Sequence, residues 1–159
     1  GILDFVSDEN PDIVLTASGD TPTLEVIKSV SILKKFLNIK VRVVCVVDLL
    51  KLKKLSEKEF QDLFMKVPNV FVFHGYKNLI YELLYERKVN MKVLGYSEIG
   101  KITTPFDMRV INKIDRFNIC LTISKMLKID TTELENYCNM MLKKHKNYIK
   151  KYGKDMEEI

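Results

Sequence analysis

Residues 102–117 are ITTPFDMRVINKIDRF, and they separate two parts of the chain that differ in pattern. Before them, short apolar runs alternate with helix-forming stretches; after them, the pattern is helical. Pro105 suits the first turn of a helix because it lacks an amide hydrogen, and Thr103 or Thr104 could accept hydrogen bonds from the free amides there. Asp115 precedes an apolar stripe at helical spacing and is expected to cap a second helix. We therefore expect a hinge here.

The same segment contains one large aromatic residue near its start and several charged residues. Phe106 interrupts a polar stretch, so we expect it to dock the exit of the preceding strand against the helical end of the chain. The charges could be catalytic, but mixed charges at helix starts more often serve as caps and ion pairs. We expect that structural role for four residues: Asp107, Arg109, Asp115 and Arg116.

Strand and helix signals alternate through the first hundred residues. Strands are predicted at residues 13–17, 41–47, 70–73 and 91–96. Residues 41–47 are nearly all β-branched, so this strand is expected to be the most buried one, at the sheet centre and parallel to residues 13–17. The order predicts a three-layer α/β/α fold with a doubly wound, mostly parallel sheet of about five strands.

Helix boundaries are also marked in the sequence. Asp20 or Thr21 is expected to cap the helix that follows the first strand, and Ser56 with Glu59 has the pattern of a capping box. The last helix is expected at about residues 132–152. We expect residues 1–11 to be a linker from upstream domains and residues 12–159 to form a single C-terminal α/β domain with a helical end.

The charge of +5 is concentrated near the end of the chain, where six lysines lie between residues 143 and 154 without an acid. Nucleic-acid binding would need stacking aromatics or a groove-fitting element, and neither is evident, so a solvated lysine face is expected. The longest apolar run, residues 43–47, is far too short to span a membrane. We expect a cytoplasmic protein that binds neither nucleic acid nor membrane.

The cysteines and histidines form no metal or redox pattern. Cys45, Cys120 and Cys138 lie in apolar contexts without paired spacing, so buried thiols are expected rather than zinc ligands or a disulfide. His145 lies on a lysine-rich helix, where packing or surface exposure is expected.

The ends of the predicted strands supply the candidate site, because ligands of open α/β sheets lie outside the carboxyl ends of the strands. Gly19 could let backbone amides approach a phosphate, but Asp20 puts negative charge there, so a helix cap is favoured. His74 could carry a proton, but no nucleophile pairs with it, so a structural or interface role is favoured. No catalytic residue is assigned. The candidates for a ligand crevice or interface are Gly19, Asp20, Thr21, His74, Gly75, Tyr76, Thr103 and Thr104.

Several segments resemble, in the same order, those of the xylulose-5-phosphate/fructose-6-phosphate phosphoketolases. The similarity extends over nearly the whole chain. The segments are residues 12–14 and 18–25 (DIV, SGDTPTLE), 41–44 and 47–49 (VRVV, VDL), 73–76 (FHGY), 103–109 (TTPFDMR) and 115–117 (DRF).

The resemblance implies a transketolase-like C-terminal domain without catalytic residues, which is inactive alone. Thiamine diphosphate and a divalent metal, Mg or Ca, would be held by upstream domains, with no cofactor in this part. The complete enzyme would convert xylulose 5-phosphate or fructose 6-phosphate and phosphate to acetyl phosphate and an aldose phosphate. The domain would pack on the upstream domains and support a homodimer or higher oligomer. Residues 51–56 are shorter and more basic than the family's loop.

An alternative function also fits the predicted fold. The strand-end crevice could make this chain an autonomous or regulatory module that binds a nucleotide or a sugar phosphate.

Overall fold

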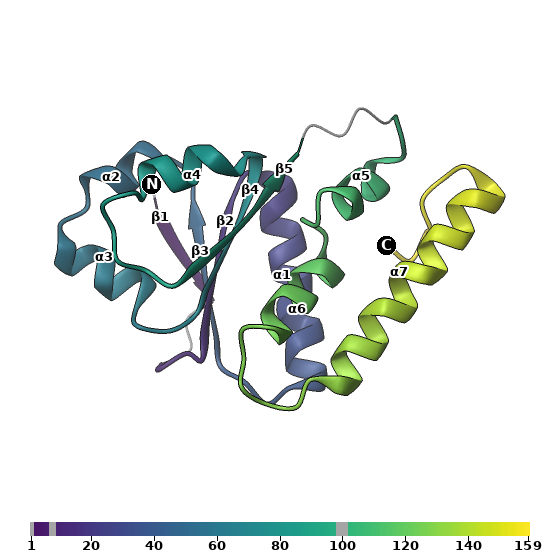
Figure 1. Ribbon diagram of the computed structural model, residues 1–159, viewed down its shortest axis with the longest axis horizontal. Helices are drawn as coiled ribbons and strands as arrows, with labels where there is room; N and C mark the ends of the chain where they lie inside the picture. The colour runs from purple at the N-terminus through teal and green to yellow at the C-terminus, as the bar shows by residue number, and fades with distance from the viewer. Residues whose placement is uncertain (1, 7–8, 98–101) are drawn as a thin grey trace.

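The computed structural model describes residues 2–6, 9–97 and 102–159. Five strands form one sheet in the order β1-β3-β2-β4-β5 (Figure 1). β1 is antiparallel to β3, and the other neighbouring strands are parallel, as expected for a mostly parallel sheet. The strands are β1 (Ile2–Val6), β2 (Ile13–Ser18), β3 (Val41–Val46), β4 (Asn69–Tyr76) and β5 (Met91–Tyr96).

Helices cover both faces of the sheet, which confirms the three-layer architecture. Figure 1 shows α1 and α6 on one face and α2, α3 and α4 on the other, with α7 packed outside α6. The helices are α1 (Asp20–Phe36), α2 (Leu50–Lys54), α3 (Glu57–Phe64), α4 (Lys77–Leu83), α5 (Pro105–Ile111), α6 (Arg116–Ser124) and α7 (Thr132–Tyr152).

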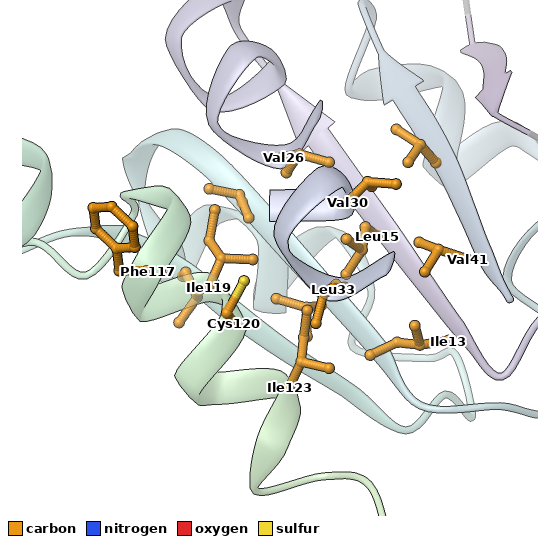
Figure 2. Close-up of a cluster of buried hydrophobic side chains, with 14 of the residues drawn as sticks. Ile13, Leu15, Val26, Val30, Leu33, Val41, Phe117, Ile119, Cys120 and Ile123 are labelled. Atoms are coloured by element: carbon orange, nitrogen blue, oxygen red, sulfur yellow. The ribbon is translucent and has the colours of Figure 1, made fainter. Parts of the chain in front are cut away.

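β2 is the centre of the core. All six of its residues are buried, and its side chains alternate between two apolar clusters. Ile13, Leu15 and Ala17 join the cluster formed with α1, α6 and α7, whereas Val14 joins the cluster formed with α2, α3 and α4. Figure 2 shows Leu33 of α1 near Cys120 and Ile123 of α6, and all three belong to the same cluster as Ile13 and Leu15 of β2. The fold thus has an apolar layer on each face of the sheet.

The expectation that residues 41–47 form the central, most buried strand is wrong, although their parallel pairing with residues 13–17 is confirmed. β3 lies between β1 and β2, and two of its six side chains are only half-buried. Val47, beyond its end, is 68% exposed. β-branched residues favour strand conformation, but they do not determine which neighbours a strand acquires.

Within the segment expected to be a linker, residues 2–6 form the strand β1. β1 pairs antiparallel with β3 and shifts register between Asp4 and Val6. β1 lies at the edge of the sheet, where it pairs with β3 alone among the described strands.

The helix caps follow the sequence in part. Ser56 and Glu59 form the expected capping box at α3, and the Asp115 carboxylate accepts hydrogen bonds from the amides of Phe117 and Asn118 at α6. The expected cap by Asp20 or Thr21 is wrong, because the N-cap of α1 is Gly19, which has no side chain to accept a hydrogen bond.

The last helix follows the sequence expectation, and burial of the cysteines follows it for two of the three. α7 spans the expected residues 132–152. All three cysteines are free thiols, with Cys120 and Cys138 buried and Cys45 half-buried. Within the described residues, no helix is long and apolar enough to cross a membrane.

Candidate functional site

The carboxyl ends of β2 and β4 meet where the strand order reverses. From β2 the chain passes through α1 to β3, which lies on one side of β2 in the sheet. β4 lies on the other side of β2, so a crevice is expected between the carboxyl ends of β2 and β4. Gly19 and His74 lie at this point, and a Cβ placed on Gly19 would be only 2.8 Å from the Cβ of His74. The His74 side chain therefore occupies the space beside the Gly19 backbone that an anion would need.

Gly19→Ala should destabilise the protein. Gly19 has φ +104°, which L-residues adopt only with strain, and the added methyl would also collide with His74. We expect a loss of about 1–3 kcal/mol in the free energy of unfolding, measured by urea denaturation. Gly153→Ala is the matched control, because Gly153 also has positive φ but has open space around it. Equal losses in the two variants would show that the contact with His74 does not restrict residue 19.

The other crevice candidates lie in strand or helix. His74, Gly75 and Tyr76 belong to β4, which extends three residues beyond the predicted strand at 70–73. The pairing of β4 with β5 resumes at Tyr76 and Tyr96 after a register shift, and the His74 and Tyr96 rings lie 5.3 Å apart. A shallow hollow of about 330 Å³ lies beside them, lined by Tyr76, Lys77, Asn78, Tyr96 and Ser97.

Thr103 and Thr104 do not join this crevice. The Thr104 hydroxyl donates a hydrogen bond to the carboxylate of Asp155, and the Thr103 hydroxyl donates one to Asp107. Thr104 is the N-cap residue of α5, but its side chain accepts no hydrogen bond from the helix amides, so the expected hydroxyl cap is wrong. Asp155 takes that role, because its carboxylate accepts a hydrogen bond of 3.0 Å from the Phe106 amide. The sequence-predicted candidates thus occupy two separate regions.

Two hinge arginines converge on a carboxylate that is fully buried in α1. Glu25 is 0% exposed and accepts hydrogen bonds of 2.8–2.9 Å from the amide and guanidinium of Arg116 and from the guanidinium of Arg109. Burial acts to raise the pKa of Glu25, but the hydrogen bonds and charge of Arg116, with Arg109, outweigh it and leave the pKa lowered. The ion-pair role expected for these arginines is confirmed.

His145 is a buried titratable side chain of α7. It is 1% exposed, and its ring packs edge-on against Phe106 with centroids 4.9 Å apart. Its Nε2 lies 3.8 Å from carboxylate oxygens of both Asp107 and Asp155, beyond hydrogen-bond distance. Burial lowers the pKa of His145, against the opposing charges of Asp155, Asp107 and Asp115. The ring is therefore held mainly neutral, and the expected packing role is confirmed.

His145 should make stability depend on pH. A lowered pKa in the folded state means that the unfolded chain binds more protons, so stability falls as the pH drops below the ordinary histidine value of 6.5. We expect the melting temperature to decline from about pH 7.5 to about pH 5.5. The decline should be shallower in His145→Leu than in the unsubstituted protein. An equally steep decline in His145→Leu would contradict the assignment.

The crevice offers no evident place for a thiamine diphosphate and its metal. Among residues 2–6, 9–97 and 102–159, no group of three or more His, Cys, Asp or Glu side chains is placed to hold a metal ion. At the N-terminus of α1, where the phosphates of a cofactor could bind, the space beside Gly19 is occupied by the His74 side chain. The described residues therefore do not fit the cofactor.

A family model described as the XFP C-terminal domain matches residues 1–159. The chain belongs to this family. Three relatives are similar to this chain over all or nearly all of its length. They are a "Probable phosphoketolase" of Clostridium acetobutylicum (42% identical over 99% of the chain), one of Chlorobaculum tepidum (39% over 100%) and the "Xylulose-5-phosphate phosphoketolase" of Lactiplantibacillus pentosus (40% over 100%).

The chain spans about a fifth of the length of these relatives, 22% in each case. Solved structures support the fold of the XFP C-terminal domain. A transketolase from Leishmania mexicana matches with a TM-score of 0.64 and 18% identity, over 79% of this chain and 18% of its own. A structure described as "Split gene transketolase, inactive beta4 tetramer" matches with a TM-score of 0.58 and 19% identity, over 79% of this chain and 42% of its own. The expected transketolase-like fold is confirmed.

Sequence reasoning missed the hydrogen-bonded centre of this XFP C-terminal domain. Glu25 was part of the family-like segment 18–25, but its buried partner is 91 positions away in the sequence. Asp155 lies among lysines and glutamates near the end of the chain, where nothing local distinguishes it. One available signal was an acid in the apolar stripe of α1, since Glu25 precedes Val26 and lies one turn before Ser29 and Val30, all buried.

Proposed function

We propose that this chain is the C-terminal, non-catalytic domain of a phosphoketolase and supports that enzyme's assembly. The observation that carries this proposal is the match of the whole chain to the XFP C-terminal domain. The phosphoketolase relatives are longer proteins, and this chain covers only 22% of their length. The parent enzyme would cleave xylulose 5-phosphate, fructose 6-phosphate or both with phosphate, giving acetyl phosphate and an aldose phosphate. In it, residues 12–159 would form one domain that the chain enters through residues 1–11.

Exposed apolar side chains at the carboxyl edge of the sheet support an assembly role. Tyr76 ends β4, Val47 follows β3, and both are more than half exposed. Leu50 and Leu79 lie in the first turns of α2 and α4, and Leu24 lies near the start of α1. Carboxyl ends of parallel strands share one edge, so these side chains gather at one end of the molecule. An exposed apolar edge of this kind favours contact with another protein surface.

The upstream part of the parent would hold thiamine diphosphate and its divalent metal, Mg or Ca. We also propose that the parent is a cytoplasmic homodimer or higher oligomer. These assignments follow from the phosphoketolase names of the relatives rather than from any group in the described residues.

Activity measurements on two proteins test the proposal. The parent polypeptide should form acetyl phosphate from xylulose 5-phosphate or fructose 6-phosphate with phosphate and thiamine diphosphate, detected as the hydroxamate. Residues 1–159 alone should form none and should show no heat of thiamine diphosphate binding by calorimetry. Turnover or tight cofactor binding by residues 1–159 alone would overturn the proposal.

The hollow beside Tyr76 and Tyr96 is the basis of a second candidate function, in which the chain is an autonomous module that binds a small phosphate metabolite. A nucleotide or sugar phosphate bound there would stabilise the fold by about 2.7 kcal/mol at 100 times its dissociation constant. A thermal-shift screen of residues 1–159 against phosphate metabolites would detect this. We expect no shift, and a specific shift lost in Tyr76→Ala would favour the autonomous binding module.

A further inference from the structure

α5 and α7 lie at the end of the molecule away from α2 and α3 (Figure 1). Side chains of these two helices line a groove of about 580 Å³. Val110 and Ile111 of α5 and Leu142 and Ile149 of α7 give it aliphatic walls, and none of the four is fully buried. His145 lies between them, and neither of its ring nitrogens has a hydrogen-bond partner among the residues that the structure describes. The groove therefore offers an apolar surface that the described residues leave uncovered.

Lysines of α7 line the groove beside this apolar surface. Lys143, Lys146 and Lys150 are exposed and are spaced three and four residues apart, so they share one face of the helix. Within the described parts of the chain, none of the three pairs with a carboxylate. Lys144, on another face of the same helix, does pair with Glu158 at 3.0 Å. Positive charge on the groove side is thus left uncompensated.

The acid in the groove does not neutralise these lysines. Asp107 accepts a hydrogen bond from the Thr103 hydroxyl, and its other carboxylate oxygen faces His145. A ligand of complementary chemistry would combine aliphatic side chains with several carboxylates. A helix that lays its apolar face in a groove and its acids along the rim has this chemistry. Among the described residues, His145 is the sole aromatic ring lining the groove, and it is buried against Phe106, so no exposed ring is offered on which nucleic-acid bases would stack.

We propose that the α5–α7 groove binds an acidic amphipathic segment of the remaining part of the parent polypeptide. The inference rests on the proposed function, because it takes the partner from the four fifths of the relatives' length that this chain does not cover. Apolar side chains of the segment pack between α5 and α7, and its carboxylates pair with Lys143, Lys146 and Lys150. The surface gives the domain a second contact, distinct from the carboxyl edge of the sheet.

Zero-length carbodiimide cross-linking of the intact parent tests the contact, because it joins an amine to a carboxylate only when they touch. Peptide mass spectrometry should find Lys143, Lys146 or Lys150 linked to Asp or Glu residues upstream of residue 1. Lys151, on the same helix outside the groove, should show no such link. Mixing isotope-labelled and unlabelled parent separates links within a chain from links between copies. Links only to residues 1–159 of a second copy would overturn the proposal.

Charge reversal gives an independent readout. Lys146→Glu/Lys150→Glu should raise amide exchange in α5 and α7 about tenfold in the intact parent but should leave exchange in isolated residues 1–159 unchanged. Lys151→Glu is the matched control and should alter neither protein. Equal exchange in the parent and its variant, or an equal rise in the isolated chain, would overturn the proposal. If the parent forms acetyl phosphate but shows no such cross-links, only the proposed binding in the groove is disproved. If the parent forms no acetyl phosphate, the proposed function is disproved.

Discussion

Replacing Glu25 with glutamine is expected to cost about 3–5 kcal/mol of folding free energy, a large part of the stability of a typical domain. The substitution keeps the size of the side chain but removes the charge that compensates Arg116, which is only 7% exposed. A buried guanidinium without a counter-charge is strongly destabilising. Chemical denaturation of residues 1–159 and of the Glu25→Gln variant measures the loss. It should be present at neutral pH, because the lowered pKa keeps Glu25 ionised there.

Glu57→Gln is the matched control for this experiment. Glu57 forms a comparable pair with Arg87 at 2.9 Å, but it lies on the surface, where solvent screens the interaction. Its replacement should change stability far less than Glu25→Gln. If both variants lost the same free energy, burial would not be the reason for the importance of Glu25.

Phe106→Ala should lower stability by a similar amount, about 3–5 kcal/mol. Phe106 is 2% exposed and packs edge-on against Phe117 and His145, and the guanidinium of Arg116 lies 5.2 Å from its ring centre. Its removal would leave a cavity where α5, α6 and α7 meet. A fall in the melting temperature of the isolated domain would measure the effect, because the stability of a two-state domain sets that temperature.

Asp107→Asn serves as the comparison for Phe106→Ala. Asp107 lies one position further along α5, is half-buried, and accepts one hydrogen bond from Thr103. Its replacement should lower the melting temperature only modestly. An intact melting temperature in Phe106→Ala, with loss of dimer assembly or acetyl phosphate formation in the parent, would instead make this residue part of a contact surface.

The parts of this fold that sequence reasoning predicted are those determined by neighbouring residues. The capping box of Ser56 and Glu59 and the cap by Asp115 span only three positions each, so the sequence contains the whole interaction. The parallel strands were also recognisable, because strands buried on both faces form short apolar runs. The burial of Phe106 followed from its place as a lone aromatic in a polar stretch.

The parts that could not be predicted depend on residues far apart in the chain. The position of β3 in the sheet depends on its pairing with β1, about 40 positions earlier in the chain, and no local pattern links the two strands. Glu25 is stabilised by arginines 84 and 91 positions away, and no local pattern pairs them. The candidate residues also lie apart in the structure. Thr103 bonds to Asp107 of α5 and Thr104 bonds to Asp155 near the C-terminus, so neither joins the strand ends.

The capping of α5 by Asp155 bears on the order in which this chain can fold. α5 has seven residues and is too short to persist alone, and its capping carboxylate lies 49 positions downstream of the Phe106 amide. During synthesis, α5 therefore lacks this cap until the residues after α7 have left the ribosome. The hinge helix and the C-terminal turn should consequently become ordered together, as a late cooperative unit. A nascent chain stalled before residue 155 would expose the groove walls of α5 to chaperones, even though the sheet and α1 were already complete.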